Sequence, residues 1–216
     1  MTTTAWVFTG GDPPDSRSLA EHRPDHLVVA ADSGLTHALA AGVAVDVVVG
    51  DLDSVDAAEL DRAVAAEARV EQHPTDKNQT DLELALHVAR RAGAHRIVVL
   101  GAGGGRLDHF LANTMVLAAP ALGDVDIEAH IERSRVHVVR AGRPRALRGA
   151  PGDILTLLPV GGAARGVRAT GVRWELRTED LASGSSRGVS NEMTAETAFV
   201  DLDEGVLIAI QPSPGS

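Results

Sequence analysis

The stretch that decides the fold is HLVVAADSGLTHALAAGVAVDVVVGDLDS, residues 26–54. It contains two apolar, largely β-branched runs of strand length, at 26–31 and 46–50. The segment 35–42 between them has the apolar spacing of a short helix. Nearly continuous apolar strands are typical of strands that are buried on both faces. The stretch therefore predicts one βαβ unit of a parallel sheet.

The same alternation continues on both sides of this unit. Two of the helices that it predicts begin with the spacing of a capping box, from Asp56 to Glu59 and from Thr80 to Glu83. Further strands are expected at 5–9, 70–73 and 96–100, and further helices at 56–69, 80–93 and 107–119. The first part of the chain is therefore predicted to be an α/β domain with a parallel sheet.

The pattern changes after residue 124, where short apolar runs alternate with turns rich in Gly, Pro and Ser. These runs lie at 126–131, 135–140, 153–160, 171–176, 198–202 and 205–210. None of this region shows a convincing helical period, so it predicts a small all-β domain, either a sandwich or a barrel. The boundary between the two domains is expected near residues 120–135, and the segment 124–131 is either the last strand of the first domain or the start of the second.

Composition limits the classes of function. The chain has 216 residues, 44% of them hydrophobic, which excludes intrinsic disorder, and it has no cysteine, which excludes disulfides and thiolate chemistry. Its net charge of −10 disfavours non-specific binding to nucleic acid or to an anionic membrane. No apolar run is long enough to span a membrane, and the first residues do not resemble a signal peptide, so a cytoplasmic protein is expected.

Acidic residues follow four of the predicted strands, at the edge where ligands bind to open parallel sheets. A single aspartate after a strand is usually a turn former or a helix cap. Several carboxylates on one edge repel one another unless a cation neutralises them, and Mg²⁺, often bound together with phosphates, is the natural candidate. The residues concerned lie in the segments 32–34, 50–54, 76–81 and 101–109.

A glycine-rich run, Gly101–Arg106, follows a predicted strand and opens a predicted helix. Backbone N–H groups at such a position favour an anion, and Arg106 adds a guanidinium that can hold phosphate oxygens. The dinucleotide fingerprint fails because arginine stands where it requires glycine, and a Walker A motif is absent. Taken alone, the run is either a tight turn or a ligand cradle.

Three single residues each allow two interpretations. His109, beside Asp108, is either a surface histidine or part of the site. Lys77, the only lysine among twenty basic residues, is either a solvated loop residue or a phosphate contact. Trp174 is by default a core residue of the β domain, and the alternative is an aromatic face for a planar ligand.

Taken together, five ordered blocks make the chain resemble the thiamine pyrophosphokinase (thiamine diphosphokinase) family. The blocks are Ala31–Gly34, Gly50–Ser54, Asp76–Glu83, Gly103–His109 with Asn113, and Gly171–Leu176 with Ser186–Asn191. One position departs from the pattern, because the third block usually has aspartate where this chain has Asn78. That departure removes a charge but leaves Asp81 in place.

The resemblance implies transfer of the pyrophosphoryl group of ATP to thiamine, which gives thiamine diphosphate and AMP. It implies a Rossmann-like nucleotide domain over residues 1–130 that binds ATP and Mg²⁺. A β-sandwich over 131–216 would bind thiamine and form the dimer interface. The partners implied are ATP, thiamine and a second copy of the chain, in a homodimer whose active sites are shared between subunits.

The resemblance also implies roles for particular residues. The catalytic set would be Asp51, Asp53, Asp81 and Arg106, and the three aspartates would bind the metal. ATP would be bound by Asp32, Ser33, Gly34, Ser54, Lys77, Thr80, Gly103, Gly104, Gly105, Asp108 and His109. Thiamine would be bound by Trp174, Ser190 and Asn191.

Three other functions stay open at this point. The first is a pyrophosphokinase for another alcohol, such as a pterin, against which Trp174 and the Ser190–Asn191 pair argue. The second is a non-catalytic nucleotide-binding regulatory module of the same fold, which would be expected to have lost its aspartates. The third is a dehydrogenase, which Arg106 disfavours because the fingerprint needs glycine there.

Overall fold

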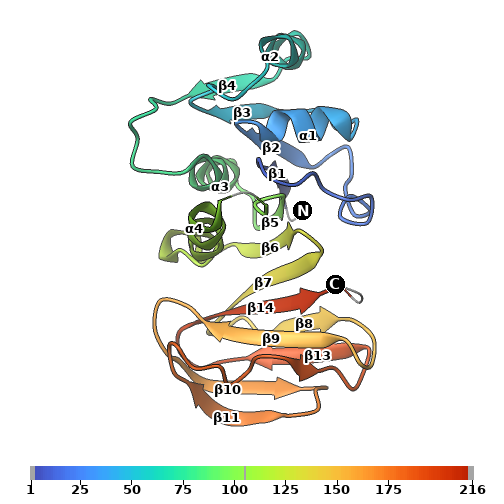
Figure 1. Cartoon of the computed structure of the whole chain (residues 1–216), viewed down its shortest axis with the longest axis vertical. Coiled ribbons are helices and arrows are strands. Elements are labelled where there is room, and N and C mark those ends of the chain that lie inside the picture. Colours follow the sequence, from blue (N-terminus) through green and yellow to red (C-terminus); the bar gives the residue numbers. More distant parts are fainter. Residues whose placement is uncertain (1–2, 105, 214–216) are drawn as a thin grey trace. The chain divides into compact units, whose positions relative to one another are not determined.

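The computed structural model describes residues 3–104 and 106–213. The chain divides into two compact units. One comprises Met1–Val116 with Asp124–Glu132, and the other comprises Leu117–Gly123 with Arg133–Ser216. Figure 1 shows the helices gathered in the first unit and antiparallel strands filling the second. No helix among the described residues is long and apolar enough to cross a bilayer.

The first unit is an α/β domain built on six parallel strands, in the order β6-β5-β1-β2-β3-β4. The strands are β1 (Thr4–Phe8), β2 (Leu27–Ala31), β3 (Val47–Gly50), β4 (Arg69–Gln72), β5 (Arg96–Leu100) and β6 (Asp126–Ile131). The helices are α1 (Gly34–Ala40), α2 (Ala57–Ala65), α3 (Asp81–Arg91) and α4 (Leu107–Leu117). The predicted parallel α/β architecture is therefore confirmed.

Burial follows the sequence pattern. In β1, β2 and β5 every residue after the first is buried, and all of β3 is buried, as expected for strands covered on both faces. β4 lies at the edge of the sheet and is mostly exposed. The Asp56 side chain accepts the Glu59 N–H at 3.1 Å, and Thr80 Oγ1 accepts the Glu83 N–H at 3.2 Å, so both predicted helix caps form.

The helix predicted over 56–69 is too long by one turn. α2 ends at Ala65, and Glu67 has a φ of 71°, a left-handed conformation that a helix cannot continue through. Arg69 then begins β4 and pairs with Val47 of β3. The apolar spacing of the region could not show this ending, because the terminating residue is a glutamate rather than a glycine.

The strand order creates a crevice at one point of the sheet. From β1 the chain moves outward through β2, β3 and β4, and it then returns to the other side of β1 as β5. The loops that follow β1 and β5 therefore leave the sheet in opposite directions. In open α/β sheets this switch point, outside the carboxyl ends of the strands, is where ligands bind.

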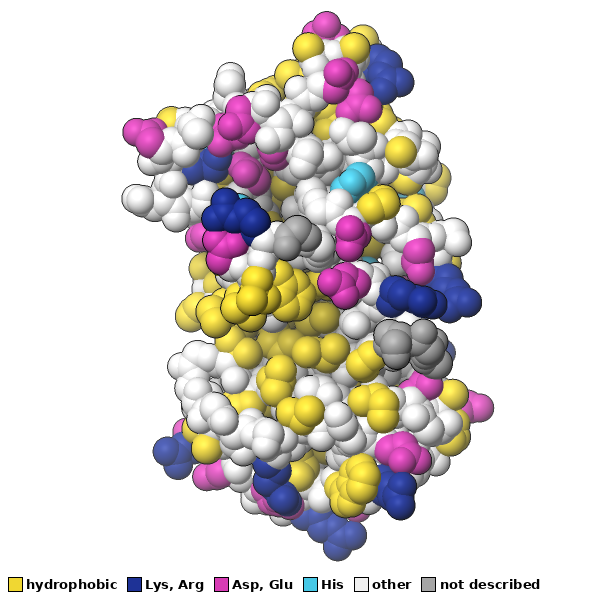
Figure 2. Space-filling model, viewed as in Figure 1, with side chains coloured by type: hydrophobic (Ala, Val, Ile, Leu, Met, Phe, Trp, Pro, Cys, Tyr) yellow, Lys and Arg dark blue, Asp and Glu magenta, His cyan; other side chains and the backbone are white. Residues whose placement is uncertain are grey.

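Helix α4 exposes apolar side chains. Leu107, Leu111 and Met115 follow one another at four-residue spacing on this helix and are 70%, 47% and 62% exposed. Figure 2 shows hydrophobic side chains gathered over this helix. A contiguous apolar stripe of this kind is typical of a surface that another molecule covers.

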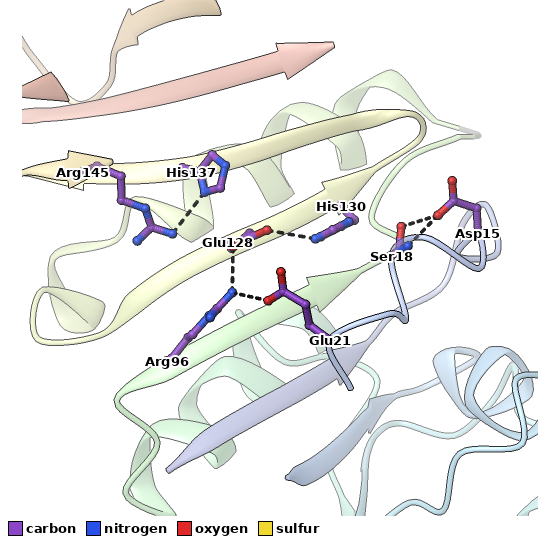
Figure 3. A network of polar contacts seen from close by, with 8 residues as sticks. All are labelled: Asp15, Ser18, Glu21, Arg96, Glu128, His130, His137 and Arg145. Carbon is purple, nitrogen blue, oxygen red and sulfur yellow. Dashed lines mark hydrogen bonds and ion pairs between the residues drawn. The ribbon is translucent and has the colours of Figure 1, made fainter. Parts of the chain in front are cut away.

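The connection between β1 and β2 contains no helix. Arg96 of β5 holds it against the sheet by donating to Glu21 at 3.1 Å, while the same guanidinium donates to Glu128 of β6 at 3.0 Å. His130 lies 3.1 Å from Glu128 and extends this network (Figure 3). Farther along the connection, His22 packs edge-on against the Trp6 ring, with 5.3 Å between the ring centroids.

The second unit consists of two antiparallel sheets, β12-β9-β14-β7 and β11-β10-β13-β8. Side chains from both sheets form one apolar core, with Leu155, Leu207 and Val200 among its members. The strands are β7 (Ser134–Arg140), β8 (Arg145–Arg148), β9 (Ile154–Pro159), β10 (Ala164–Thr170), β11 (Leu176–Leu181), β12 (Asn191–Glu192), β13 (Thr197–Asp201) and β14 (Val206–Pro212). The predicted all-β region is confirmed, and its strands are antiparallel.

The strand predicted at 171–176 is wrong. Residues 171–175 form the turn between β10 and β11, and only Leu176 belongs to a strand. Gly171 has a φ of 73°, and a Cβ there would lie 2.5 Å from the Thr197 carbonyl oxygen, so this position requires glycine. The turn places Trp174 outside both sheets.

Candidate active site

A cleft of about 540 Å³ opens in the α/β unit at the switch point of its sheet. Its walls come from the segments that follow the five strands β1 to β5 and from the first turns of α3 and α4. The lining residues that carry the argument below are Asp32, Asp51, Asp53, Lys77, Asp81 and Arg106. Strand ends that lie far apart in the sequence therefore meet in one site.

Three carboxylates converge in this cleft. Asp32, Asp51 and Asp53 each offer an oxygen within 4.8 Å of those of the other two. Burial raises the pKa of Asp32, and the negative charges of Asp81, Asp51 and Asp53 raise it further. One buried oxygen of Asp32, Oδ1, has no hydrogen-bond partner in the described structure. Hard oxygen donors, mutual repulsion and an unsatisfied carboxylate oxygen fit the requirements of a divalent cation such as Mg²⁺.

Backbone strain is concentrated at the same edge. Asp32, Leu52 and Ala102 have φ values of 48°, 66° and 66°, in the left-handed region that residues other than glycine seldom adopt. Gly50 has a φ of 151°, and a Cβ there would lie 3.1 Å from Asp81 Oδ1 and 3.2 Å from Asp32 Cβ. Strained backbone conformations persist only where the surrounding structure imposes them, and they occur most often at functional sites.

Lys77 joins two of the acidic residues. Its Nζ lies 3.0 Å from Asp51 Oδ2 and 3.0 Å from Asp81 Oδ1, and its side chain is 13% exposed. Partial burial by itself would lower the pKa of Lys77, but the ion pairs with Asp81 and Asp51 outweigh it and the pKa is raised. The same contact holds the pKa of Asp51 below its ordinary value. The interpretation of Lys77 as a solvated loop lysine is therefore wrong.

Asp81 lies outside the group of three carboxylates. The resemblance places it with Asp51 and Asp53 as a metal ligand, whereas the structure brings Asp32 to those two. Asp81 Oδ1 instead contacts Lys77 and lies beside Gly50.

Arg106 stands at the mouth of the cleft, just after the glycine run. It donates two hydrogen bonds to Asp108, at 3.1 and 2.6 Å, and both side chains are largely exposed. This pairing lowers the pKa of Asp108 to about 2, so Asp108 stays ionised and holds the guanidinium in place. Gly103 and Gly104 line the cleft, whereas Gly105 lies outside the described residues.

The other residues expected to bind ATP divide into two groups. Ser33, Ser54, Thr80 and His109 all line the cleft. Gly34 does not, and its role is one of packing, since a Cβ there would lie 2.2 Å from the Phe8 carbonyl oxygen. Thr80 uses its hydroxyl oxygen to cap α3, which leaves the hydroxyl proton free to donate elsewhere.

Sequence reasoning missed the first strand end. Thr9, Gly10 and Gly11 follow β1 and line the cleft opposite Gly103. Gly11 has a φ of 103°, and a Cβ there would lie 2.1 Å from the Gly103 carbonyl oxygen. The signal was present, because the glycine pair follows a predicted strand just as the acidic segments do. Phe110 was missed as well and lies in the first turns of α4.

A second pocket, of about 370 Å³, lies in the β unit. Trp174 borders it with 57% of its surface exposed, so the default assignment of this residue to the core is wrong. The Arg173 guanidinium lies over the ring, 5.1 Å from its centroid. The remaining walls come from Glu175, Leu176, Ser186, Arg187, Gly188, Val189 and Asn191.

Asn191 holds the Trp174 turn in place. Its Oδ1 accepts from the Trp174 N–H at 3.0 Å and from the Glu192 N–H at 2.9 Å, and its Nδ2 donates to the Trp174 carbonyl at 2.8 Å. Ser190 is not among the residues that line the pocket, and its N–H donates to Thr156 Oγ1 at 3.0 Å. Of the three predicted thiamine contacts, Trp174 and Asn191 therefore line the pocket and Ser190 does not.

Comparison with known proteins gives the same assignment for both units. The family model for the thiamin pyrophosphokinase catalytic domain matches residues 20–128, and that for the thiamin pyrophosphokinase vitamin B1 binding domain matches residues 140–207. The chain is 25% identical over 206 residues to the thiamine pyrophosphokinase of Bacillus subtilis, covering 95% of this chain and 96% of that protein.

Solved structures agree with this result. The crystal structure of the Bacillus subtilis protein superposes with a TM-score of 0.83 at 25% identity, covering 97% of this chain and 99% of that one. That of thiamin pyrophosphokinase from Geobacillus thermodenitrificans gives a TM-score of 0.82 at 27% identity, covering 99% of both chains. With both units matched in order, the chain belongs to the thiamin pyrophosphokinase family.

Proposed function

We propose that this chain transfers the pyrophosphoryl group of ATP to the hydroxyl group of thiamine and releases AMP. The observation that carries the proposal is the convergence of Asp32, Asp51 and Asp53 at the switch point of the α/β sheet. Such a crevice is where Rossmann-like domains bind nucleotides, and we assign the α/β unit this role. Membership of the thiamin pyrophosphokinase family supports the choice of thiamine over a pterin alcohol.

Mg²⁺ is the proposed metal, and Asp51 and Asp53, with Asp32 beside them, would hold it. Asp81 joins them in the proposal as the ligand implied by the family resemblance. When bound, Mg²⁺ supplies charge neutralisation and alignment of the triphosphate, which phosphoryl-type transfer needs more than covalent help. The acidic cleft can then accept an anionic substrate in spite of its own charge.

Arg106 is the proposed partner of the phosphate oxygens. Because Asp108 holds its guanidinium from one side, the donors that point away from Asp108 are available to a ligand. Gly103 and Gly104 line the same cleft and would offer their backbone N–H groups. Together they would stabilise the negative charge that grows on the bridging oxygen as AMP leaves.

Trp174 is the proposed contact for thiamine. Thiamine carries a cationic thiazolium ring, and an exposed indole face attracts a cation and stacks on planar rings. Arg173 already lies near this ring, so we expect thiamine to displace it or to use the other face. Asn191 would act by holding the turn, and Ser190 stays a proposed polar contact of the pyrimidine.

We also propose that the protein works as a cytoplasmic homodimer. The apolar stripe of Leu107, Leu111 and Met115 supports this, since the same helix carries His109 and Asn113 of the cleft on other positions. A second copy covering the stripe would bury it and lie close to the cleft. In the shared-site arrangement, the phosphates bind one subunit and thiamine contacts the β unit of the partner.

The reaction is tested by incubating the protein with ATP, Mg²⁺ and thiamine and identifying both products. We expect AMP and thiamine diphosphate in equal amounts, and no turnover after chelation of the metal. ADP with thiamine monophosphate would overturn the proposal in favour of an ordinary kinase. Replacing thiamine by a pterin alcohol in the same assay tests substrate choice, and preferred turnover of the pterin would contradict it.

The shared site is tested by mixing two impaired variants and assaying them with thiamine well below the wild-type KM. Under these conditions pure homodimers of Asp51→Ala are expected to be nearly inactive, and those of Trp174→Ala to keep less than about a tenth of wild-type activity. Refolded together, they form hybrids in which one site carries both changes and the other carries neither. Random pairing makes half of the dimers hybrids with one intact site each, so roughly a quarter of wild-type activity returns. No recovery in hybrids confirmed by differential tags would place each site within one chain.

A further inference from the structure

Lys77 forms ion pairs with Asp51 and Asp81, two of the carboxylates that would hold a metal. We propose that the Lys77 ammonium is a built-in counter-ion that competes with the divalent cation for the same carboxylates and must leave them when the metal binds. The inference rests on the proposed function, because it takes the acidic cluster to be a metal site. It adds a displacement step that the family resemblance does not contain.

The first argument is geometric. Lys77 Nζ lies 3.0 Å from Asp51 Oδ2 and 3.0 Å from Asp81 Oδ1, so it bridges two of the three carboxylates that the resemblance assigns to the metal. A carboxylate oxygen that faces an ammonium at this distance points at that charge rather than at a second cation. Asp51 also belongs to the group whose oxygens lie within 4.8 Å of one another. The ammonium and a divalent ion therefore compete for one set of ligands.

The second argument is electrostatic. Lys77 is only 13% exposed, and Asp51 is 13% and Asp81 31% exposed, so water screens these charges less than it screens ordinary surface pairs. A divalent cation between the carboxylates would stand within a few ångströms of the ammonium and repel it. Moving Lys77 away removes that repulsion and leaves its charge available for phosphate oxygens of the nucleotide.

The third argument is the choice of residue. The chain uses arginine at nineteen of its twenty basic positions, and Lys77 is the exception. A guanidinium would grip a carboxylate with two parallel hydrogen bonds in a fixed plane, whereas an ammonium is a compact point charge on a flexible stem. Lysine can therefore leave its carboxylate partners more easily than arginine can. Asp81 and Lys77 lie four residues apart across the start of α3, so the stem can swing without moving the helix.

The single lysine makes the movement directly observable. Full-length protein grown with lysine labelled with ¹³C at Cε gives one side-chain signal, which belongs to Lys77. After removal of divalent ions, Mg²⁺ alone is titrated in without nucleotide. We expect the Lys77 signal to shift and sharpen in step with metal binding, which isothermal titration calorimetry follows on the same sample. Metal binding that leaves the signal unchanged overturns the inference, and so does the absence of metal binding.

Two substitutions give a second readout. Lys77→Met removes the charge at similar length, and we expect it to raise the affinity for Mg²⁺ in the absence of nucleotide about tenfold. This is more than an exposed ion pair contributes, because the side chains of Lys77 and Asp51 are each only 13% exposed. Lys77→Arg keeps the charge and is expected to bind Mg²⁺ no more tightly than the wild type. The control is Arg62→Met, which removes a charge from the Arg62–Glu59 pair on α2, where the Arg62 side chain is 66% exposed. Equal affinities in wild type and Lys77→Met would overturn the competition.

These measurements are independent of turnover. AMP formation is assayed separately on the wild-type protein with ATP, Mg²⁺ and thiamine, and its failure would count against the proposed function alone. A protein that forms AMP but shows no response of Lys77 to the metal would keep its function and lose the displacement step.

Discussion

The two pockets of this chain are built on opposite principles. The cleft of the α/β unit brings together acidic groups that repel one another, holds Asp32 and Ala102 in left-handed conformations, and leaves a buried oxygen of Asp32 without a hydrogen bond. The pocket of the β unit shows an exposed Trp174 on a turn whose polar groups are satisfied by Asn191.

The difference follows from what each pocket has to do. Binding a metal and a triphosphate requires charges that are unfavourable until the ligand arrives, and the fold around them must supply the stability that they cost. Recognising a flat organic cation requires only a firmly held aromatic face. The comparison predicts that substitutions in the cleft affect activity far more than stability, and that the reverse tendency holds around Trp174.

The largest effect is expected in the cleft. Asp51→Asn keeps the shape of the side chain and removes one charge, so the protein should fold normally and lose activity by about a hundred- to a thousandfold, the scale of a lost electrostatic contact in a transition state. The measurement is kcat with saturating ATP and thiamine. Asp61→Asn, an exposed aspartate of α2, is the charge control and should keep wild-type rates. Comparable rates in both variants would break the comparison.

The next effect concerns recognition. Trp174→Ala should raise KM for thiamine about tenfold to thirtyfold while KM for ATP changes little, because a cation–π contact is worth roughly 1–2 kcal/mol. Trp174→Phe keeps an aromatic face and should recover most of the loss. If KM for ATP rose as much as KM for thiamine, Trp174 would not be the contact that selects thiamine.

A loss of stability is expected when Asn191, which holds the Trp174 turn, is replaced. Asn191→Ala removes three hydrogen bonds to the backbone around the turn, and leaving these groups unpaired should lower the free energy of unfolding by roughly 1–3 kcal/mol. Chemical denaturation measures this. Ser190→Ala is the matched control: within residues 3–104 and 106–213, Ser190 hydrogen-bonds through its backbone N–H and not through its side chain, and alanine keeps that N–H. Equal stabilities of the two variants would contradict this role of Asn191.

A substitution in the cleft should raise stability instead of lowering it. Because burial and like charges raise the pKa of Asp32, its ionised form destabilises the fold, and Asp32→Asn should raise the melting temperature at pH 7, by about 2–4 °C per kcal/mol relieved. Activity should fall at the same time. Asparagine also tolerates the left-handed backbone of this position.

The pH dependence of this stabilisation follows from the direction of the pKa shift. The folded protein binds the proton of Asp32 more tightly than the unfolded chain does, so the penalty is present above the raised pKa and disappears as the pH falls through it. The melting temperatures of wild type and Asp32→Asn should therefore converge in acid. A variant that melts below the wild type at pH 7 would show that Asp32 is stabilising.

The smallest effect is expected at Asn78, where the chain departs from the family pattern. Asn78 is exposed and is not among the residues that line the cleft. Asn78→Asp should change the Mg²⁺ concentration required for half-maximal activity by less than about tenfold, or 1.4 kcal/mol. A decrease of more than about tenfold in the required Mg²⁺ concentration would mean that residue 78 contacts the metal and belongs to the cleft.

The sequence alone supports much of the fold. Periodicity located all nine helices and strands that were predicted in the first 120 residues, with an error of one turn at the end of α2. In the β unit, periodicity missed β8, β10 and β12 and all of β11 beyond Leu176, and it assigned the turn at Trp174 to a strand. Strands of a buried parallel sheet are nearly continuous apolar runs, which are easy to recognise in a sequence. Strands of an antiparallel sheet that is exposed on one face are half polar, so their sequences resemble those of turns.

What the sequence by itself determined is the set of chemical groups at the carboxyl ends of the strands, because the direction of parallel strands forces those ends to one edge. Only the tertiary structure decided their pairing: Asp32 joins Asp51 and Asp53, Lys77 bridges Asp51 and Asp81, and Asn191 holds Trp174. The physical reason is that hydrogen bonds and ion pairs depend on differences of a few tenths of an ångström. Such differences are set by strand order, by loop conformations such as that of Gly50, and by neighbours distant in sequence.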